Sequence, residues 1–306
     1  MKLSITESIR NEQMKLCIFG NKTATKELIT QLINSGLDIS YLVTLDADKA
    51  KKSKIAGQDD RLIKFASNQK IQAFNPENYS LKSSRDISFF QTQKFDLGLC
   101  TGWQRLIPKP IIDSFSHGVF GWHGSGFRFP NGRGRSPLNW SLRLGMKQVY
   151  HNCFKYAYGV DDGVVYETEV IPIEESDYIA DVQRKALEHI KDSSLRLIAE
   201  INNGGVDLKH QPTHPYITFP ALDESSGEIF PELMSCDQTI NLIRSCSRPF
   251  PGAYVMQGEH KFCVWTARVD SMNIEKHKGV REVDNKLLIT LPDGQVISDN
   301  YELIGV

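Results

Sequence analysis

The chain has 306 residues, 40% of them hydrophobic and 24% charged, with a formal net charge of -1. This balance is typical of a globular protein with room for two domains, and the small net charge disfavours a global attraction to nucleic acid or anionic membrane. The six cysteines form no CxxC pair, no stretch of about 18 apolar residues is present and the N-terminus lacks a signal-peptide core, so we expect a reduced, cytoplasmic protein without a metal ion.

The first half of the chain alternates short apolar runs with stretches of helical spacing. Strand, helix and strand over 16–20, 23–35 and 39–45 predict a parallel β-α-β unit, and no GxGxxG fingerprint follows the first strand. We expect the charged segment 46–61 to be a solvated loop, with an RNA- or phosphate-binding loop as the alternative. The remaining elements predicted in this half are strands over 71–74, 95–100 and 118–122 and helices over 84–93 and 108–114.

The second half begins with two strands and a long helix and ends in short strands. The periodicity predicts strands over 148–156 and 164–171, a helix over 178–202 that stops at two glycines, and a proline-rich connector over 211–231. A helix over 236–245 and a PDG hairpin turn at 292–294 are also expected. The predicted terminal strands cover 253–256, 261–269, 286–291 and 295–298.

These patterns predict an α/β protein with a Rossmann-like domain, which contains a parallel sheet, and a small C-terminal β-barrel-like domain. The predicted divisions are an N-terminal tail (1–12), a Rossmann-like domain (13–205), a linker (206–235) and a C-terminal domain (236–306).

The stretch 118–140, GVFGWHGSGFRFPNGRGRSPLNW, carries the main chemical signal. His123 follows a predicted apolar strand and begins a loop rich in glycine and arginine. Ser136 is a candidate N-cap and Pro137 a candidate first residue of the next helix. Asp161, in the segment GVDDG, follows a strand that could run beside the His123 strand. A carboxylate that faces a histidine orients the imidazole for general acid–base chemistry, although DDG is also an ordinary turn sequence.

Taken together, the motifs resemble the formyltransferases that use 10-formyltetrahydrofolate, most closely the sugar N-formyltransferases. The resemblance covers roughly residues 14–270. Its carriers are HGS (123–125), RGRSPLNW (133–140), DDG (161–163), RPFPGAYV (248–255) and KFCVWTARV (261–269). The resemblance implies a Rossmann-type catalytic domain with an appended β-domain, with His123 and Asp161 in the catalytic set.

The third member of the family's catalytic set, an asparagine, maps to Gly121. By resemblance that asparagine polarises the formyl oxygen, and losing one such donor typically costs on the order of 10²–10³ in rate. Three explanations remain open: a replacement donor, a slow enzyme or one with a different substrate, or a degenerate homologue. Candidate donors are Asn152, Asn131, backbone N–H groups and protonated His123. Because residues alternate along a strand, we expect Asn152 to reach the space beside Gly121. Asn152, as a third catalytic residue, or an ordered water would then supply the missing donor.

The resemblance also implies ligand contacts. Expected folate-binding residues are Trp103, Arg105, Leu106, Ile107, Gly124, Ser125, Val160 and Asp162; Arg133, Arg135 and Asn139 are expected to orient the acceptor. Trp103 as a core aromatic and Arg133 as a structural arginine remain alternatives.

The leading functional prediction is formyl transfer from 10-formyltetrahydrofolate to the amine of a nucleotide-linked amino sugar. Methionyl-tRNA formyltransferase is the first alternative, which the net charge disfavours but Lys49, Lys51, Lys52 and Lys54 leave open. A catalytically silent protein that binds folate or a nucleotide sugar is the second. We expect a small-molecule substrate, neither membrane nor nucleic acid as a partner, and leave open a homodimer.

Overall fold

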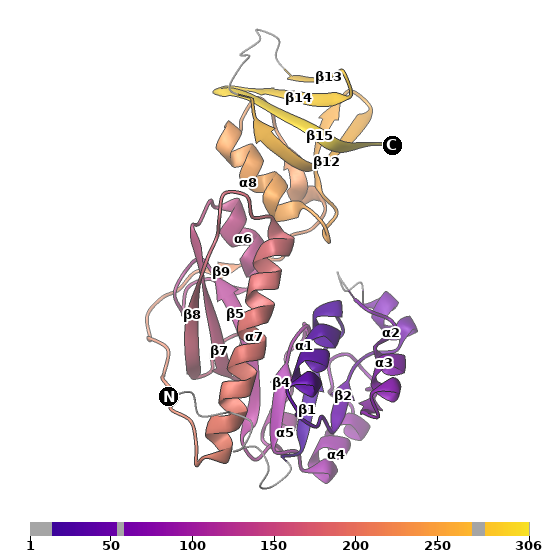
Figure 1. The fold of residues 1–306 in the computed structure, drawn as a ribbon, viewed down its shortest axis with the longest axis vertical. Helices are drawn as coiled ribbons and strands as arrows, with labels where there is room; N and C mark the ends of the chain where they lie inside the picture. The colour runs from indigo at the N-terminus through magenta and orange to yellow at the C-terminus, as the bar shows by residue number, and fades with distance from the viewer. Residues whose placement is uncertain (1–13, 54–57, 271–278, 306) are drawn as a thin grey trace. The chain divides into compact units, whose positions relative to one another are not determined.

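The computed structural model describes residues 14–53, 58–270 and 279–305 (Figure 1). The described chain divides into two compact units. Unit 1 contains residues 14–123, 151–169 and 186–215, and unit 2 contains residues 124–150, 170–185 and 216 onwards. The predicted tail over 1–12 lies outside the described residues, and the predicted domain boundaries at 205 and 235 stay predictions.

Unit 1 is built on a seven-stranded sheet with the strand order β3-β2-β1-β4-β5-β7-β8. The first five strands in this order pair in parallel, and the order reverses beside β1, as in a Rossmann-like sheet. The predicted α/β fold class is therefore confirmed. The strands are β1 (Leu16–Phe19), β2 (Tyr41–Val43), β3 (Gln72–Phe74), β4 (Leu97–Cys100), β5 (Gly118–Ser125), β7 (Gln148–Lys155) and β8 (Val165–Pro172).

Helices cover both faces of this sheet because its buried strands alternate apolar side chains between the two faces. Leu16 and Ile18 pack in one cluster with residues of α1, α3 and α7, whereas Cys17 and Phe19 pack in another with residues of α4 and α5. The helices are α1 (Thr23–Asn34), α3 (Leu62–Asn68), α4 (Ser84–Gln93), α5 (Lys109–Ile112) and α7 (Ile179–Asn202). Among the described residues, no helix combines the length and apolarity that a membrane span needs.

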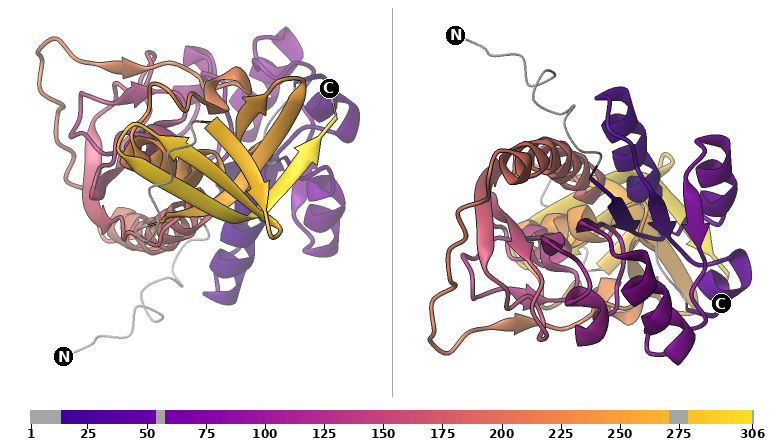
Figure 2. Two further views of the ribbon diagram at one scale, coloured as in Figure 1. Left: turned by 90° about the horizontal axis from the view of Figure 1, so that it is seen from above. Right: turned by 90° about the horizontal axis from the view of Figure 1, so that it is seen from below.

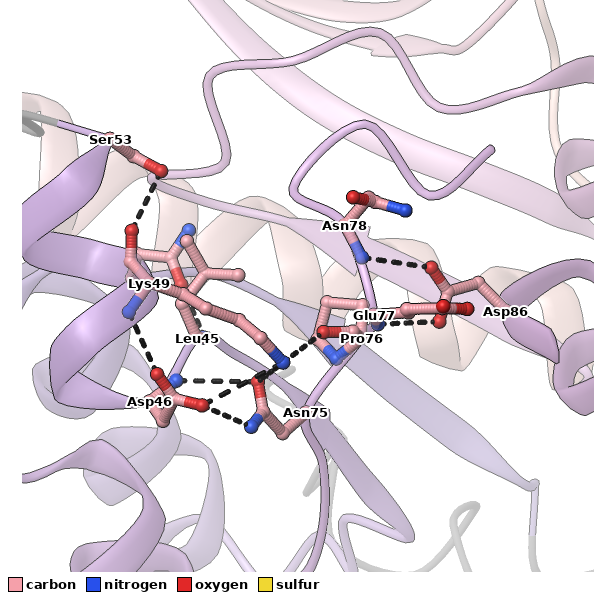
Figure 3. A network of polar contacts seen from close by, with 10 residues as sticks. Leu45, Asp46, Lys49, Ser53, Asn75, Pro76, Glu77, Asn78 and Asp86 are labelled. Atoms are coloured by element: carbon pink, nitrogen blue, oxygen red, sulfur yellow. Dashed lines mark hydrogen bonds and ion pairs between the residues drawn. The ribbon is translucent and has the colours of Figure 1, made fainter. Parts of the chain in front are cut away.

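The prediction of an irregular loop over 46–61 is wrong, because it contains the helix α2 (Ala47–Lys52). Asp46 caps this helix by accepting from the Lys49 backbone N–H at 2.8 Å. The Asn75 amide donates to the same carboxylate at 2.6 Å, and the Lys49 ammonium donates to the Pro76 carbonyl at 2.7 Å (Figure 3). These bonds tie the loops after β2 and β3 together, so Lys49 is a structural residue. Lys54 lies outside the described residues.

Unit 2 contains a six-stranded sheet in the order β10-β11-β12-β15-β14-β13, in which all neighbours but the β10–β11 pair run antiparallel. Figure 2 shows it as a curled sheet. One apolar cluster joins it to α8 (Cys236–Cys246), and Pro292-Asp293 form the predicted hairpin turn. The strands are β10 (Glu228–Ile229), β11 (Ala253–Gln257), β12 (His260–Val269), β13 (Gly279–Val283), β14 (Lys286–Leu291) and β15 (Gly294–Ile304). The expected small C-terminal β-domain is confirmed.

The remaining elements of unit 2 are short. β6 (Arg133–Gly134) pairs in parallel with β9 (Thr218–Phe219), which falls within the segment predicted as a connector. A single 3-10 turn covers Ser225–Gly227. The helix α6 (Pro137–Arg143) starts where predicted, but Ser136 has a left-handed backbone (φ 54°) and its side chain makes no capping bond.

Candidate functional site

The histidine of the HGS motif lies within a strand and not in the loop after it. β5 continues to Ser125, three residues further than predicted, so His123 is part of the sheet. Val119, Gly121 and His123 share one face of this strand by alternation. Val119 packs in the cluster that also contains Trp103, and the imidazole of His123 is buried, with 6% of the residue exposed.

Asp161 lies in the turn between β7 and β8 and has a positive φ of 51°. Gln211 holds this turn, because its side-chain amide donates to the carbonyls of Asp161 and Gly163, each at 2.8 Å. Gly163 allows the close approach: a Cβ there would lie 1.7 Å from the Lys155 carbonyl oxygen, so only glycine fits. The local sequence therefore fixes the backbone that carries the carboxylate.

The structure brings His123 and Asp161 together, as the sequence predicted. Their Nδ1 and Oδ2 atoms are 3.4 Å apart, and the carboxylate side chain is 22% exposed. A carboxylate in this position orients the ring and stabilises positive charge that develops on it. The pair is thus arranged for proton transfer through the other ring nitrogen, Nε2.

The space beside Gly121 is filled by Tyr156. A Cβ placed on Gly121 would meet three atoms of the Tyr156 phenol first: Cε1 and the hydroxyl oxygen at 2.4 Å and Cζ at 2.6 Å. Contacts below 3.0 Å are essentially never made by real Cβ atoms. Glycine at position 121 is therefore the residue that admits the tyrosine.

The expectation that Asn152 fills this space is wrong. Asn152 is 3% exposed, and its amide nitrogen donates to the His123 carbonyl at 3.3 Å while its oxygen accepts from the Thr168 hydroxyl at 2.7 Å. Both ends of the amide therefore link neighbouring strands. The other asparagine considered, Asn131, accepts from the Ile217 backbone at 3.1 Å within unit 2.

A buried polar cluster in unit 1 was missed by sequence reasoning. His151 and His189 are 3% and 2% exposed, and their Nδ1 atoms lie 2.6 Å apart. The only signal for it was a histidine within the largely apolar strand 148–156. Burial, with the nearby charges of His189 and His123, lowers the pKa of His151 well below its ordinary value.

Glu167 completes the cluster. It lies 3.0 Å from His189 Nε2 and accepts from the Arg196 guanidinium at 2.8 Å. Burial raises the pKa of the Glu167 carboxyl, but hydrogen bonds and charges from His189 and Arg196 outweigh burial and lower it to about 2.

The residues predicted to line the folate pocket in unit 1 divide into buried and exposed members. Trp103 and Ile107 are buried, and the Trp103 ring packs edge-on against Phe19 and Tyr79. The Trp103 indole nitrogen is buried and has no hydrogen-bond partner among the described residues. Trp103 is thus a core aromatic that carries an unsatisfied donor.

The other predicted folate residues of unit 1 are accessible. Leu106 and Val160 are 54% and 51% exposed, so both present apolar surface to solvent. Arg105 and Asp162 are also exposed, and the Arg105 guanidinium lies 5.1 Å from the Tyr79 ring.

Unit 2 holds the remaining predicted ligand residues. Gly124 is buried, and Ser125 is fully buried, where its hydroxyl accepts from the Phe127 backbone at 3.2 Å. Arg133 is 7% exposed and its guanidinium lies 4.5 Å from the Tyr216 ring, which favours the structural alternative. The Arg135 side chain is exposed.

Asn139 has a packing role that the prediction of acceptor binding did not include. It is 6% exposed, and its amide donates to the Ser245 carbonyl at 2.8 Å, which links α6 to α8. This bond is a packing contact within unit 2, and acceptor binding by Asn139 stays a prediction.

Comparison with known proteins gives relatives in sequence and in fold. The model of the formyl transferase family matches residues 14–196. A methionyl-tRNA formyltransferase from Lactobacillus acidophilus is 26% identical over 247 residues, which are 80% of this chain and 76% of the relative.

Two solved structures are similar in fold. HypX from Aquifex aeolicus has a TM-score of 0.69 and 14% identity, over 96% of this chain and 46% of HypX. An N-formyltransferase from Helicobacter canadensis, in complex with folinic acid and dTDP-3-aminofucose, has a TM-score of 0.67 and 14% identity, over 94% of this chain and 100% of that chain. This chain spans about half of HypX, and at such identities the likeness shows the fold alone.

The family match covers more than half of the chain and includes His123 and Asp161, whose side chains face each other. It confirms the predicted enzyme class and the co-substrate of that class, 10-formyltetrahydrofolate. Whether the acceptor is a sugar or a tRNA is a separate question. The chain belongs to the formyl transferase family.

Proposed function

We propose that this enzyme transfers the formyl group of 10-formyltetrahydrofolate to the amine of a nucleotide-linked amino sugar. The observation that carries the chemistry is the pair of His123 and Asp161, with Nδ1 and Oδ2 3.4 Å apart on a buried strand and a braced turn. Two features support a nucleotide-linked sugar as the acceptor. The net charge of -1 disfavours tRNA, and the motif RGRSPLNW resembles that of the sugar N-formyltransferases.

In this mechanism the acceptor amine attacks the formyl carbon while His123 Nε2 accepts the proton that the amine loses. The tetrahedral intermediate collapses when its C–N10 bond breaks, and protonated His123 returns the proton to N10 of the departing tetrahydrofolate. Asp161 stays ionised and holds the ring throughout. Atoms and protons balance, and the products are the formamide and tetrahydrofolate.

The accessible apolar side chains of unit 1 give the folate a place in this proposal. Leu106 and Val160 are about half exposed, whereas the Trp103 indole nitrogen is buried and has no hydrogen-bond partner in the part of the chain that the structure describes. The pterin of 10-formyltetrahydrofolate would cover this apolar surface. Tetrahydrofolate binding to a Leu106→Ala variant should therefore be weaker than to the native protein.

A tRNA acceptor is the second candidate, and the sequence relatives favour it. Binding of tRNA draws most of its affinity from phosphate neutralisation, which a chain of net charge -1 provides only through a local patch. Of the lysines that would form such a patch, Lys49 is bound to Pro76 and Asp46.

The decisive experiment offers 10-formyltetrahydrofolate with either dTDP- and UDP-linked amino sugars or charged initiator tRNA, and follows the formylated product by mass spectrometry. We expect product from at least one sugar nucleotide, and none from the His123→Ala variant. Product from tRNA alone, inhibited by salt, would replace the proposal with the second candidate. Folate binding without any product would identify a silent homologue.

A further inference from the structure

Position 121 is where the family resemblance places a hydrogen-bond donor, and here it is glycine. The nearest atoms to a Cβ at this position include the Tyr156 hydroxyl oxygen, at 2.4 Å. From standard amide bond lengths, the amide nitrogen of an asparagine lies about 2.4 Å from its own Cβ. The Tyr156 hydroxyl oxygen and the amide nitrogen of an asparagine at position 121 would therefore lie at the same distance from the Cβ position of residue 121.

We propose that the Tyr156 hydroxyl is the donor that stabilises the formyl oxygen during transfer, in place of an asparagine at position 121. The inference rests on the proposed formyl transfer and adds to it a catalytic residue, the one that directly follows β7 (Gln148–Lys155). Two further observations support it: the phenol is held in place, and it carries its proton.

The tyrosine is fixed by contacts on both its backbone and its ring. Its N–H donates to the Val119 carbonyl at 2.7 Å, two residues before Gly121 on β5. Its ring stacks on Phe154, with centroids 5.2 Å apart and planes inclined by 29°. Gly121 and His123 share a face of β5, so the hydroxyl lies along the same face as the histidine. A hydrogen-bond donor that is already in position does not have to reorient when negative charge develops on the formyl oxygen, so its stabilisation of the transition state carries no reorganisation cost.

The hydroxyl is also in the right protonation state. Burial, together with the nearby Cys100 and Asp161, raises the pKa of Tyr156 well above its ordinary value of 10. Burial likewise raises the pKa of Cys100 to about 12, although its hydrogen bond with Tyr156 opposes this. A neutral thiol is a weak hydrogen-bond acceptor. A formyl oxygen that gains negative charge is a stronger one, so the Tyr156 hydroxyl donates to it in preference to Cys100.

The step balances without a net proton transfer from tyrosine. As the amine nitrogen bonds to the formyl carbon, the C=O π pair moves to the oxygen, and the Tyr156 O–H donates to that oxyanion. When the C–N10 bond breaks, the electron pair on the oxyanion re-forms the C=O bond, and the hydrogen bond from Tyr156 weakens. Tyr156 remains a phenol throughout, and His123 moves the one proton that changes place.

The first test compares Tyr156→Phe with Tyr158→Phe. The former removes the hydroxyl and keeps the ring; the latter removes a phenol hydroxyl from the same segment, where it is exposed and bonded to Asp113. We expect kcat to fall about 10²–10³-fold in Tyr156→Phe, with tetrahydrofolate affinity unchanged, and to stay near native in Tyr158→Phe. A kcat within about threefold of native in Tyr156→Phe would overturn the inference.

A second test moves the donor. Gly121→Asn alone should lose activity, since its side chain and the phenol compete for one space. In the double variant Gly121→Asn/Tyr156→Ala that space is open, so kcat should exceed that of Tyr156→Ala by about tenfold or more. A double variant no faster than Tyr156→Ala contradicts the inference. Native protein without formyl turnover refutes the proposed function, whereas an active native enzyme indifferent to Tyr156→Phe refutes only the tyrosine's role.

Discussion

Gly163→Ala tests whether the turn that carries Asp161 determines the catalytic rate. The added Cβ would lie 1.7 Å from the Lys155 carbonyl oxygen, whereas real Cβ atoms essentially never approach within 3.0 Å. Backbone must therefore move by about 1.3 Å, and Gln211, which bonds to the Gly163 carbonyl, would transmit the shift to Asp161. A misplacement of about 1 Å at a catalytic group costs about 10² in rate.

We therefore expect kcat for formyl transfer to fall about 100-fold, with a loss of about 1–3 kcal/mol in stability from overpacking. The assay is steady-state turnover of 10-formyltetrahydrofolate, with folding checked by thermal denaturation. Gly159→Ala is the matched control, because its Cβ would meet only the end of the exposed Asp162 side chain, at 2.2 Å, and that side chain can turn away. A folded Gly163→Ala enzyme with native turnover would refute the argument that this turn positions the carboxylate.

Two further predictions concern histidines. His123→Ala should reduce turnover by about 10²–10⁴ while tetrahydrofolate binding, measured by calorimetry, stays near native, and unchanged turnover would mean that another group is the base. His151 is buried with its pKa lowered, so its neutral form stabilises the fold fully above pH 6.5 and progressively less as pH falls below that value. The melting temperature should thus drop between pH 7.5 and 5.5, and drop less in His151→Gln; parallel curves would contradict this.

Apolar periodicity predicted most long elements because burial dictates both the spacing and the fold. The long helix predicted over 178–202 is α7, Ile179–Asn202, and the strand over 148–156 is β7, Gln148–Lys155. The short helix α2 was missed because its stability depends on Asn75, 29 residues from the Asp46 cap. β9 was missed because a two-residue strand is defined by its partner and not by its own pattern.

The site was predictable in part for the same reason. The pairing of His123 with Asp161 followed from motifs that mark the ends of neighbouring strands. Which residue fills the space at Gly121 did not follow, because Asn152, Phe154 and Tyr156 share one alternating face. The choice depends on the register of β7 against β5 and on the reach of a phenol, and neither can be read from one chain.

The contact between Gly121 and Tyr156 also restricts the order in which such a sequence can change. An asparagine at position 121 and a tyrosine at position 156 exclude each other in this packing, because a Cβ and the phenol would overlap at 2.4 Å. In a lineage that began with asparagine at position 121, that residue must be replaced before a tyrosine at position 156 can adopt this packing. In the reverse direction, the tyrosine must be replaced before an asparagine fits at position 121. The two positions are therefore epistatic, and a single substitution at either one reports on the pair and not on the residue alone.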